Sequence, residues 1–523
     1  MSIVDSLWSS PADAEDERRR SNYQPIEELE ALSRQEYDFV VVGGGGSGAT
    51  AAIEAADRGA SVLILEKTTI PGGSTLASGG TIRLVSDQAG TVEHFWQLSQ
   101  GATPRDVVEA FVAGLAELPH WVQQHGGELV VREEREGGGG DHARVFPISR
   151  PGSSFPNFPS ADSLAPRALL RSDLSTRKTG EALWDFLAAN LAERRVPLVL
   201  GARVVRLLQD FPARRVVGVE VEVPGGLLSV RARQGVILCS GGYAFNDELM
   251  REHFGLPLPT VCPPGRATGD GVRLAQDVGA DLWHMGATAA SVGYRPSELL
   301  AGFQCKMPSY GFVMVDQVGH RYVAETSLEN HSAVLTMLAQ DPLTGEYLRT
   351  PSYVIFDETT RLSGTVAHLP HGANRRYPWS SDNSEEVRRG WIKRADSLDE
   401  LAEQLGLPVD ALHHTIDEFN GCASRGDADA LGRTPELMHP IVAPPFYGAE
   451  VFPIIVNTQG GPRRDARGQI LRADGLPIPG LYGAGELGSM WNRLYPGAGN
   501  ICEALVSGRL AVQSALEAVV LAR

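Results

Sequence analysis

The chain has 523 residues, of which 42% are hydrophobic and 21% charged, and its formal net charge is −17 at pH 7. This length predicts two or three domains. The acidic balance argues against a nucleic-acid partner, because a phosphate backbone attracts clustered Lys and Arg. It is typical of a soluble cytoplasmic enzyme.

The cysteines are scattered and form no C-x-x-C pair, so we expect neither a disulfide framework nor a metal site. No basic segment followed by an apolar run opens the chain, and no apolar stretch reaches 18 residues. The sequence therefore predicts no secretory signal, no membrane span and a polar surface arm over residues 1–36. The five cysteines are Cys239, Cys262, Cys305, Cys422 and Cys502.

The first strong pattern is a short apolar strand over residues 39–42, followed by four glycines, a helix over 47–58 and a second apolar strand over 61–66. Strand, helix and strand in so short a span indicate a βαβ unit with buried parallel strands. An amphipathic helix is predicted next, over 103–126.

Residues 134–168 are rich in Gly, Pro and Ser and predict a long loop. The loop carries Phe146, Phe155 and Phe158, which either line a substrate pocket or belong to a variable surface excursion. A helix over 178–194 follows. Short strands are then predicted near 197–200, 203–208, 215–222, 226–232 and 235–239.

The last of these strands ends at Ser240, Gly241 and Gly242, as expected where a sheet edge meets a cofactor. From residue 275 to 437 short strands alternate with helices and the βαβ pattern stops. The chain then returns to the first domain, with a strand near 481–486 and a closing helix over 500–520.

The turn after the first strand satisfies G-x-G-x-x-G. Gly43 suits a tight turn, Gly45 allows a pyrophosphate to approach, and Gly48 allows close packing of helix and strand. The helix start, with Gly46 and Ser47, offers free N–H groups to phosphates. Glu66 ends the second strand, where a carboxylate binds ribose hydroxyls. The motif in this context predicts dinucleotide binding.

Further glycines and hydroxyls favour FAD over NAD, because a minimal NAD domain has no use for them. At the far end of the chain, Glu486 is placed to bind the ribitol, and the N–H groups of Asn500 and Ile501 to face flavin N1 and O2, where charge collects on reduction. The other candidate cofactor contacts are Lys67, Gly72, Gly73, Ser74, Thr75, Ser78, Gly79, Gly80, Val204, Ser240, Gly241, Gly242, Asp270 and Gly485.

The motifs VVVGGGGSGATAA, LEKTTIPGGSTLASGG, VILCSGGY, ATGDGVRLAQDVGA, VGHRYVAE, VIFDETTR and GLYGAGELGSM resemble those of the FAD-binding group that contains soluble fumarate reductases and 3-ketosteroid dehydrogenases. The resemblance covers about residues 37–519. It implies an α/β fold in which a Rossmann-like FAD domain is interrupted by a smaller α+β capping domain at 275–437, with the substrate between cap and flavin. It also implies noncovalent FAD. The membrane-bound relatives tether FAD to a His near the GG-S-T segment, and no His occurs here between Lys67 and Val92.

Two residues resemble the arginines with which fumarate reductases hold and protonate a dicarboxylate, Arg361 and Arg493. However, Asn457 replaces the His of the H-T-x-G-G motif, and the segment after Glu325 lacks the substrate-binding Arg. Both losses disfavour fumarate reduction.

The segment from Tyr495 to Gly499 resembles the Y-P-G-P-G of ketosteroid dehydrogenases, in which the Tyr hydroxyl and the last Gly N–H bind the ketone and stabilise the enolate. The general base of that group is a Tyr shortly after R-[FY]-x-x-E, and none occurs here. Tyr310, Glu329 and His331 are the candidates.

Arg493 points either to an acidic ketone substrate or to an ion pair with Glu486 or Glu503. We therefore expect an FAD-dependent desaturase of a cyclic or activated ketone. An ene-reductase running the reaction in reverse and an electron-transfer flavoprotein are the alternatives. The substrate is a small ketone or enone, and the electron partner is unknown.

Overall fold

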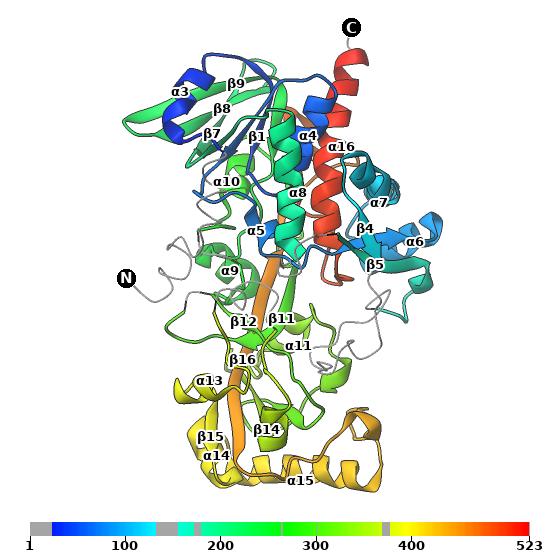
Figure 1. Ribbon diagram of the computed structural model, residues 1–523, viewed down its shortest axis with the longest axis vertical. Coiled ribbons are helices and arrows are strands. Elements are labelled where there is room, and N and C mark those ends of the chain that lie inside the picture. Colours follow the sequence, from blue (N-terminus) through cyan, green and yellow to red (C-terminus); the bar gives the residue numbers. More distant parts are fainter. Residues whose placement is uncertain are drawn as a thin grey trace.

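The computed structural model describes residues 23–131, 155–171, 179–262, 265–299, 301–368 and 377–521. Two sheets follow one another along the longest axis of the molecule, and one long strand, β16 (Phe446–Thr458), runs from the lower sheet up to the upper one (Figure 1).

The upper sheet has the order β18-β19-β9-β1-β2-β6. β1 pairs in parallel with β2 and β9, and its six residues, YDFVVV, are nearly all buried. Such an apolar run is typical of a parallel strand covered on both faces. The strands are β1 (Tyr37–Val42), β2 (Val62–Glu66), β6 (Leu198–Leu200), β9 (Gly226–Leu238), β18 (Gln469–Leu471) and β19 (Pro477–Gly483).

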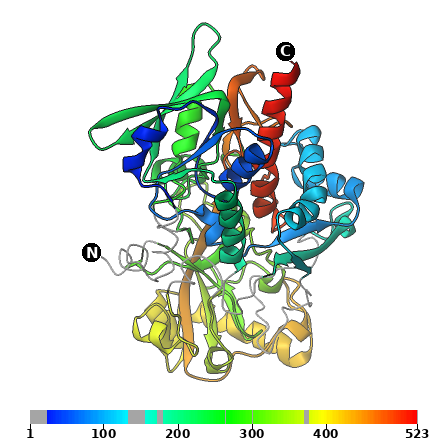
Figure 2. The same ribbon diagram turned by 45° about the horizontal axis from the view of Figure 1, so that its top comes forward.

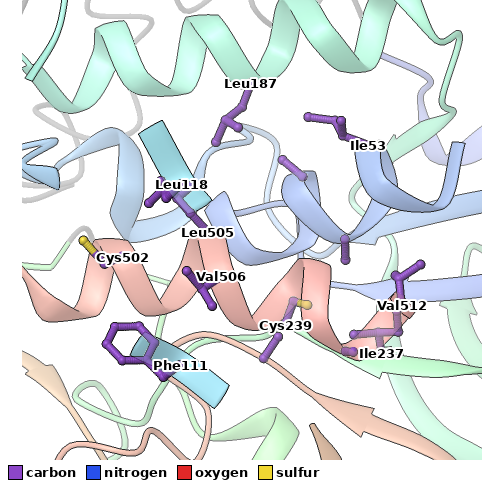
Figure 3. Packing of buried hydrophobic residues seen from close by; sticks show 14 of the residues in the cluster. Ile53, Phe111, Leu118, Leu187, Ile237, Cys239, Cys502, Leu505, Val506 and Val512 are labelled. Atoms are coloured by element: carbon purple, nitrogen blue, oxygen red, sulfur yellow. The ribbon is translucent and has the colours of Figure 1, made fainter. Parts of the chain in front are cut away.

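Helices cover one face of this sheet (Figure 1). At its centre α16 packs against α4, where the Ser47 carbonyl oxygen would lie 2.3 Å from a Cβ on Gly508. Figure 3 shows Leu505, Val506 and Val512 of α16 in the core with residues of α4, α7 and α8. The four helices are α4 (Gly46–Asp57), α7 (Arg105–Gln124), α8 (Thr179–Glu193) and α16 (Gly499–Leu521).

An antiparallel extension, β7 (Arg203–Gln209) and β8 (Val216–Val223), continues from the first half of β9. The predicted strands at 226–232 and 235–239 are therefore one strand, because the first half of β9 pairs with β8 and the second half with β1. The helices α9 (Asp247–Phe254) and α10 (Asp270–Asp277) follow.

A small sheet of order β3-β5-β4 flanks α6 and α7 (Figure 2). β5 corrects the prediction of a loop over 134–168, since a strand begins at Leu164. Phe155 and Phe158 pack together and against the main core, with ring centroids 6.0 Å apart, and Phe146 lies outside the described residues. The elements are β3 (Ile82–Val85), β4 (Leu129–Val131), β5 (Leu164–Leu170), α5 (Gly73–Leu76), α6 (Gln88–Leu98) and η2 (Ala161–Ser163).

The lower sheet is antiparallel, of order β12-β11-β16-β14-β13, with β15 on β16. Because β16 belongs to it, the predicted boundary at 437 falls too early for this sheet. The strands are β11 (Thr288–Tyr294), β12 (Phe303–Gln304), β13 (Phe312–Val315), β14 (Ser352–Asp357) and β15 (Lys393–Ala395), and β10 (Leu282–Trp283) pairs with β17 (Gly461–Pro462) higher up. The helices are η3 (Glu325–Ser327), α11 (Ala333–Met337), α12 (Glu358–Leu362), α13 (Ser384–Arg388), α14 (Leu398–Leu405), α15 (Val409–Arg425) and η5 (Pro435–Leu437).

Part of the predicted polar arm is an integral part of the sheet. Gln24 exchanges backbone hydrogen bonds with Leu198 and Leu200 of β6, at 3.1 and 3.0 Å. After η1 (Ile26–Glu28), Leu29 opens α3 (Leu29–Leu32) and is fully buried. The rest of the arm, residues 1–22, lies outside the described residues. In the ranges that the structure describes, no helix is both long and apolar enough to cross a bilayer, and no three His, Cys, Asp or Glu side chains form a metal-binding group.

Candidate active site

A glycine-rich turn joins β1 to α4 at the carboxyl edge of the upper sheet. Gly43 has a φ of +113°, and a Cβ on it would lie 2.4 Å from the carbonyl oxygen of Cys239 at the end of β9. A Cβ on Gly48 would lie 2.0 Å from the Gly43 carbonyl oxygen, so turn and helix touch only because both residues are glycine. Gly45 is the N-cap of α4, whose first N–H groups, including that of Ser47, have no partner within the helix and suit a phosphate.

The segment after β2 lies alongside this turn. The Gly72 N–H donates to the Gly44 carbonyl oxygen at 2.8 Å, and the Gly46 N–H donates to Thr75 Oγ1 at 3.2 Å. The turn and this segment therefore form one surface at the sheet edge. The same segment contains the predicted residues Gly73, Ser74, Ser78, Gly79 and Gly80.

Glu66 ends β2 beside the turn and is buried. One carboxylate oxygen accepts from the Gly44 N–H at 2.8 Å, and the other accepts from the N–H and hydroxyl of Thr68 at 2.8 and 2.7 Å. A carboxylate has about four acceptor positions, so capacity for a ribose hydroxyl is left. The Glu66 carbonyl accepts from Ala202, which brings Val204 near this end of the sheet, although the Val204 side chain is buried in the core.

Lys67 and Asp270, both predicted to contact the cofactor, pair with each other at 2.6 Å. Thr268 bonds both groups, and Arg203 lies 3.3 Å from Asp270. Burial alone would raise the pKa of Asp270, but the hydrogen bond and charge of Lys67 lower it to about 2. This ion pair thus joins the end of β2 to the start of α10.

Glu486 lies in the turn after β19, beside Thr458 of β16 and Gly242 after β9. Its Oε1 accepts from the Thr458 N–H at 3.1 Å, and a Cβ on Gly242 would lie 2.3 Å from the same oxygen. Burial raises the pKa of Glu486 to about 7, and hydrogen bonds from Thr458 and Gly242 offset only part of that rise. Gly241 lies beside the Glu486 carboxylate, and Gly485 lies beside the Ser47 side chain.

A line of polar contacts leads from Glu486 to Tyr495. Thr458 is followed back along β16 by Asn457, whose Oδ1 accepts from Asn500 Nδ2 at 2.7 Å. The Asn500 N–H donates to the Tyr495 hydroxyl at 3.0 Å. Asn457, which replaces the substrate-binding His of the fumarate reductases, therefore ties β16 to the start of α16.

Tyr495 is 5% exposed and has aromatic neighbours. Its ring contacts Trp491 edge-on at 5.8 Å, and Gly499 lies against that same indole, where a Cβ would come within 2.5 Å. Burial raises the pKa of Tyr495, so the phenol keeps its proton at neutral pH. The Asn500 N–H, which the sequence places near flavin N1 and O2, donates to this phenol in the structure.

His331 and Glu329 reach the Tyr495 side from a loop between η3 and α11. The His331 and Tyr495 rings meet perpendicularly with centroids 5.0 Å apart, and His331 Nδ1 lies 3.0 Å from Glu329 Oε1. The Ala290 N–H of β11 donates to the His331 carbonyl oxygen at 3.0 Å, which fixes this loop to the sheet. Of the three predicted base candidates, these two are brought to the site.

The other candidates lie elsewhere. Tyr310 packs against His439, and Arg361 forms a bidentate pair with Glu358 and lies over the Tyr447 ring. Because a strand rises about 3.3 Å per residue, Tyr447 is on the order of 35 Å from Thr458 along β16. The structure does not bring Arg361 to the flavin end. Arg493 is exposed, and Glu503 pairs with Arg464 at 2.7 Å rather than with it.

Two buried arginines that the sequence did not reveal hold the loops of the site. Arg83 in β3 is fully buried and donates to the carbonyl oxygens of Pro496 and Gly497 at 2.7 and 2.8 Å. Arg464 donates to the carbonyl oxygens of Gly483, Gly485 and Gly488. Neither residue belongs to a motif, and most of their acceptors are main-chain atoms, which leave no trace in side-chain patterns.

Three polar side chains beside this line have buried atoms without a hydrogen-bond partner among the described residues. They are the hydroxyl of Ser240, both amide atoms of Gln459 and the amide oxygen of Asn500. Buried polar atoms are seldom left unpaired in native proteins. Their position between the glycine-rich turn and Tyr495 fits FAD, whose ribityl hydroxyls and ring nitrogens carry the complementary donors and acceptors.

Comparison with known proteins agrees with this geometry. Residues 38–501 match the family described as FAD binding domain. The chain is 30% identical to a 3-oxosteroid 1-dehydrogenase of Mycolicibacterium smegmatis, over 92% of this chain and 97% of that protein. It is 26% identical to a 4-oxocyclohexanecarboxylate 2-dehydrogenase of Sinomonas cyclohexanicum, over 91% and 92% of the two chains.

The fold is also that of a solved 3-ketosteroid delta1-dehydrogenase from Sterolibacterium denitrificans, with a TM-score of 0.77 at 21% identity over 92% of this chain and all of that one. The family match, the glycine-rich turn and the unpaired buried groups thus lead to one conclusion. The chain belongs to the FAD binding domain family and is an FAD-dependent oxidoreductase.

Proposed function

We propose that the protein removes two hydrogens from the carbon–carbon bond next to a ketone, in a cyclic substrate, to give the α,β-unsaturated ketone. The hydrogen bond from the Asn500 N–H to the Tyr495 hydroxyl carries this proposal. A phenol that accepts from an N–H keeps its own O–H for another acceptor, and accepting strengthens it as a donor.

A ketone oxygen at this hydroxyl gains stabilisation when it becomes an enolate. Gly499 is the first residue of α16, so its N–H has no acceptor within the helix and is available as a second donor to the same oxygen. Its raised pKa keeps Tyr495 protonated, which an oxyanion donor requires. FAD, when bound, supplies the two-electron acceptor for the hydrogen on the β carbon.

Names of relatives support a ketone substrate, since the two related dehydrogenases act on an oxosteroid and on an oxocyclohexanecarboxylate. The position of Asn457 supports the choice against fumarate reduction. A side chain that ties β16 to α16 is not available as a dicarboxylate ligand.

Anaerobic titration of the FAD-loaded protein tests the proposal. Saturated 3-ketosteroids and oxocyclohexanecarboxylates are added while flavin absorbance is followed. Bleaching by a saturated ketone is the expected result. If none bleaches the flavin, but an enone reoxidises the dithionite-reduced protein, the protein is an ene-reductase and the proposed direction is wrong.

A further inference from the structure

His331 is held by its neighbours in one orientation. Glu329 accepts from the His331 backbone N–H at 2.6 Å and from the Ser332 hydroxyl at 3.1 Å through Oε2, while Oε1 meets His331 Nδ1 at 3.0 Å. Both carboxylate oxygens are thus engaged. The Glu329 carboxylate is fixed in front of the imidazole, as in sites where a carboxylate orients a base.

These contacts also select the tautomer. A carboxylate only accepts hydrogen bonds, so His331 Nδ1 carries the proton and Nε2 keeps its lone pair. The Asn330 amide nitrogen, 3.2 Å from Nε2, is a donor and agrees with this assignment, which follows from the network of partners. Nε2 is therefore the basic nitrogen, at the ring edge away from Glu329, and its lone pair takes a substrate proton once the substrate displaces the Asn330 N–H.

The imidazole lies beside the atoms that bind the ketone. Its ring is perpendicular to the Tyr495 ring at 5.0 Å, and a Cβ on Gly497 would lie 3.3 Å from His331 Cε1. Arg167 Nη2 is 3.8 Å from the same Cβ position. The α carbon of a ketone is one bond from the carbonyl carbon, so a ketone at Tyr495 presents its α-hydrogens within reach of this ring.

We infer that His331 is the catalytic base of the desaturation and that Glu329 is its positioning residue. This inference rests on the proposed function. His331 takes the role that a tyrosine has in the dehydrogenases that the sequence resembles. His331 Nε2 takes the α-proton, whose C–H electron pair forms the enolate held by Tyr495. The enolate electrons then form the carbon–carbon double bond as the β-hydrogen leaves with its electron pair to FAD. His331 finally returns its proton to solvent.

Hydrogen exchange isolates the base from the redox step. In the FAD-loaded protein reduced with dithionite under argon, a saturated ketone that bleaches the oxidised wild type has no electron acceptor, but its α-hydrogens still exchange in D₂O. Exchange is followed by proton NMR. Wild type is expected to exchange, and His331→Gln to slow exchange about 10²–10⁴-fold, the usual contribution of a general base. Its flavin absorbance and ketone affinity stay unchanged.

Glu329 and a distant histidine complete the series. Glu329→Gln is expected to lower the exchange rate without changing ketone affinity, and Glu329→Asp to restore part of it, because a carboxylate then faces Nδ1 again. Imidazole added to His331→Gly is expected to recover exchange. His439→Gln serves as the matched control, since His439 is exposed and packs on Tyr310, far from the site.

The outcomes separate the two claims. Wild-type exchange and bleaching rates in FAD-loaded His331→Gln would overturn the base assignment and leave the desaturase intact. A wild-type protein that no saturated ketone bleaches would overturn the proposed function itself.

Discussion

The two ends of β16 carry polar chemistry of different kinds. At the upper end, Thr458 and Asn457 contact Glu486 and Asn500, and buried polar atoms of Ser240, Gln459 and Asn500 lack hydrogen-bond partners among the described residues. At the lower end, the Tyr447 hydroxyl donates to Glu358 at 2.6 Å. The lower groups satisfy one another, whereas the upper ones leave capacity for a ligand.

Arginines repeat this contrast. At the lower end, the Arg361 guanidinium donates to the Glu358 carboxylate and to the Asp382 carbonyl oxygen. At the upper end, the Arg83 guanidinium donates to main-chain carbonyl oxygens of the turn that follows Tyr495. A buried arginine on backbone carbonyls sets the position of a loop, and an arginine on a carboxylate stabilises a local fold.

The largest expected effect comes from the glycine-rich turn. Gly48→Val places a side chain where even a Cβ lies 2.0 Å from a carbonyl oxygen, so α4 moves away from the turn. Protein purified from this variant is expected to contain no FAD by absorbance, whereas Gly286→Val, where a Cβ would lie 3.8 Å from its nearest neighbour, tests for a general cost of valine in place of glycine. A yellow Gly48→Val protein would contradict the assignment of this turn to FAD.

Arg83→Met tests the clamp on the turn at Pro496 and Gly497. It leaves two buried carbonyls without their donor and lets Tyr495 shift, and a displacement of about 1 Å costs roughly 100-fold in rate. We expect kcat for ketone desaturation to fall by about that factor, with FAD retained. Equal kcat values in stopped-flow traces of wild type and variant would show that the clamp does not position Tyr495.

Protonation of Glu486 predicts a pH effect on the FAD-free protein. The pKa of Glu486 is about 7 in the folded state, above the ordinary value of 4.5. The folded state therefore binds this proton more tightly than the unfolded state, and the resulting stabilisation is fully present below pH 4.5. That stabilisation is lost as pH rises from 4.5 through 7. Urea unfolding is expected to show the free energy of unfolding falling as pH rises from 4.5 to 7. In Glu486→Gln this fall is expected to be smaller, and an unchanged pH dependence in the variant would contradict the raised pKa of Glu486.

At the lower end of β16, the smallest effect is expected. Arg361→Met removes a partly buried, bidentate ion pair with Glu358, at a cost to folding of about 2 kcal/mol. Flavin content and turnover are expected to match wild type, with a small fall in Tm. A loss of turnover at full flavin content would restore Arg361 to the active site.

The parts that sequence predicted well are local. Gly43, Gly48 and Glu66 sit within a few residues of two apolar strands, so spacing alone places them at one sheet edge. Arg83 acts on residues more than 400 positions away in the chain, through their carbonyl oxygens. No side-chain pattern encodes such a contact. The choice of His331 over Tyr310 likewise required the pairing of β11 with β16, which places one near Tyr495 and the other far from it.

The most direct test of the account is the anaerobic single-turnover rate of flavin bleaching by a saturated cyclic ketone in wild type and Tyr495→Phe, at equal FAD content. The account predicts that the variant binds the ketone but bleaches about 10²–10³-fold more slowly, the usual cost of one oxyanion donor. Equal rates in the two proteins would contradict the role of the Tyr495 hydroxyl and the ketone site built on it.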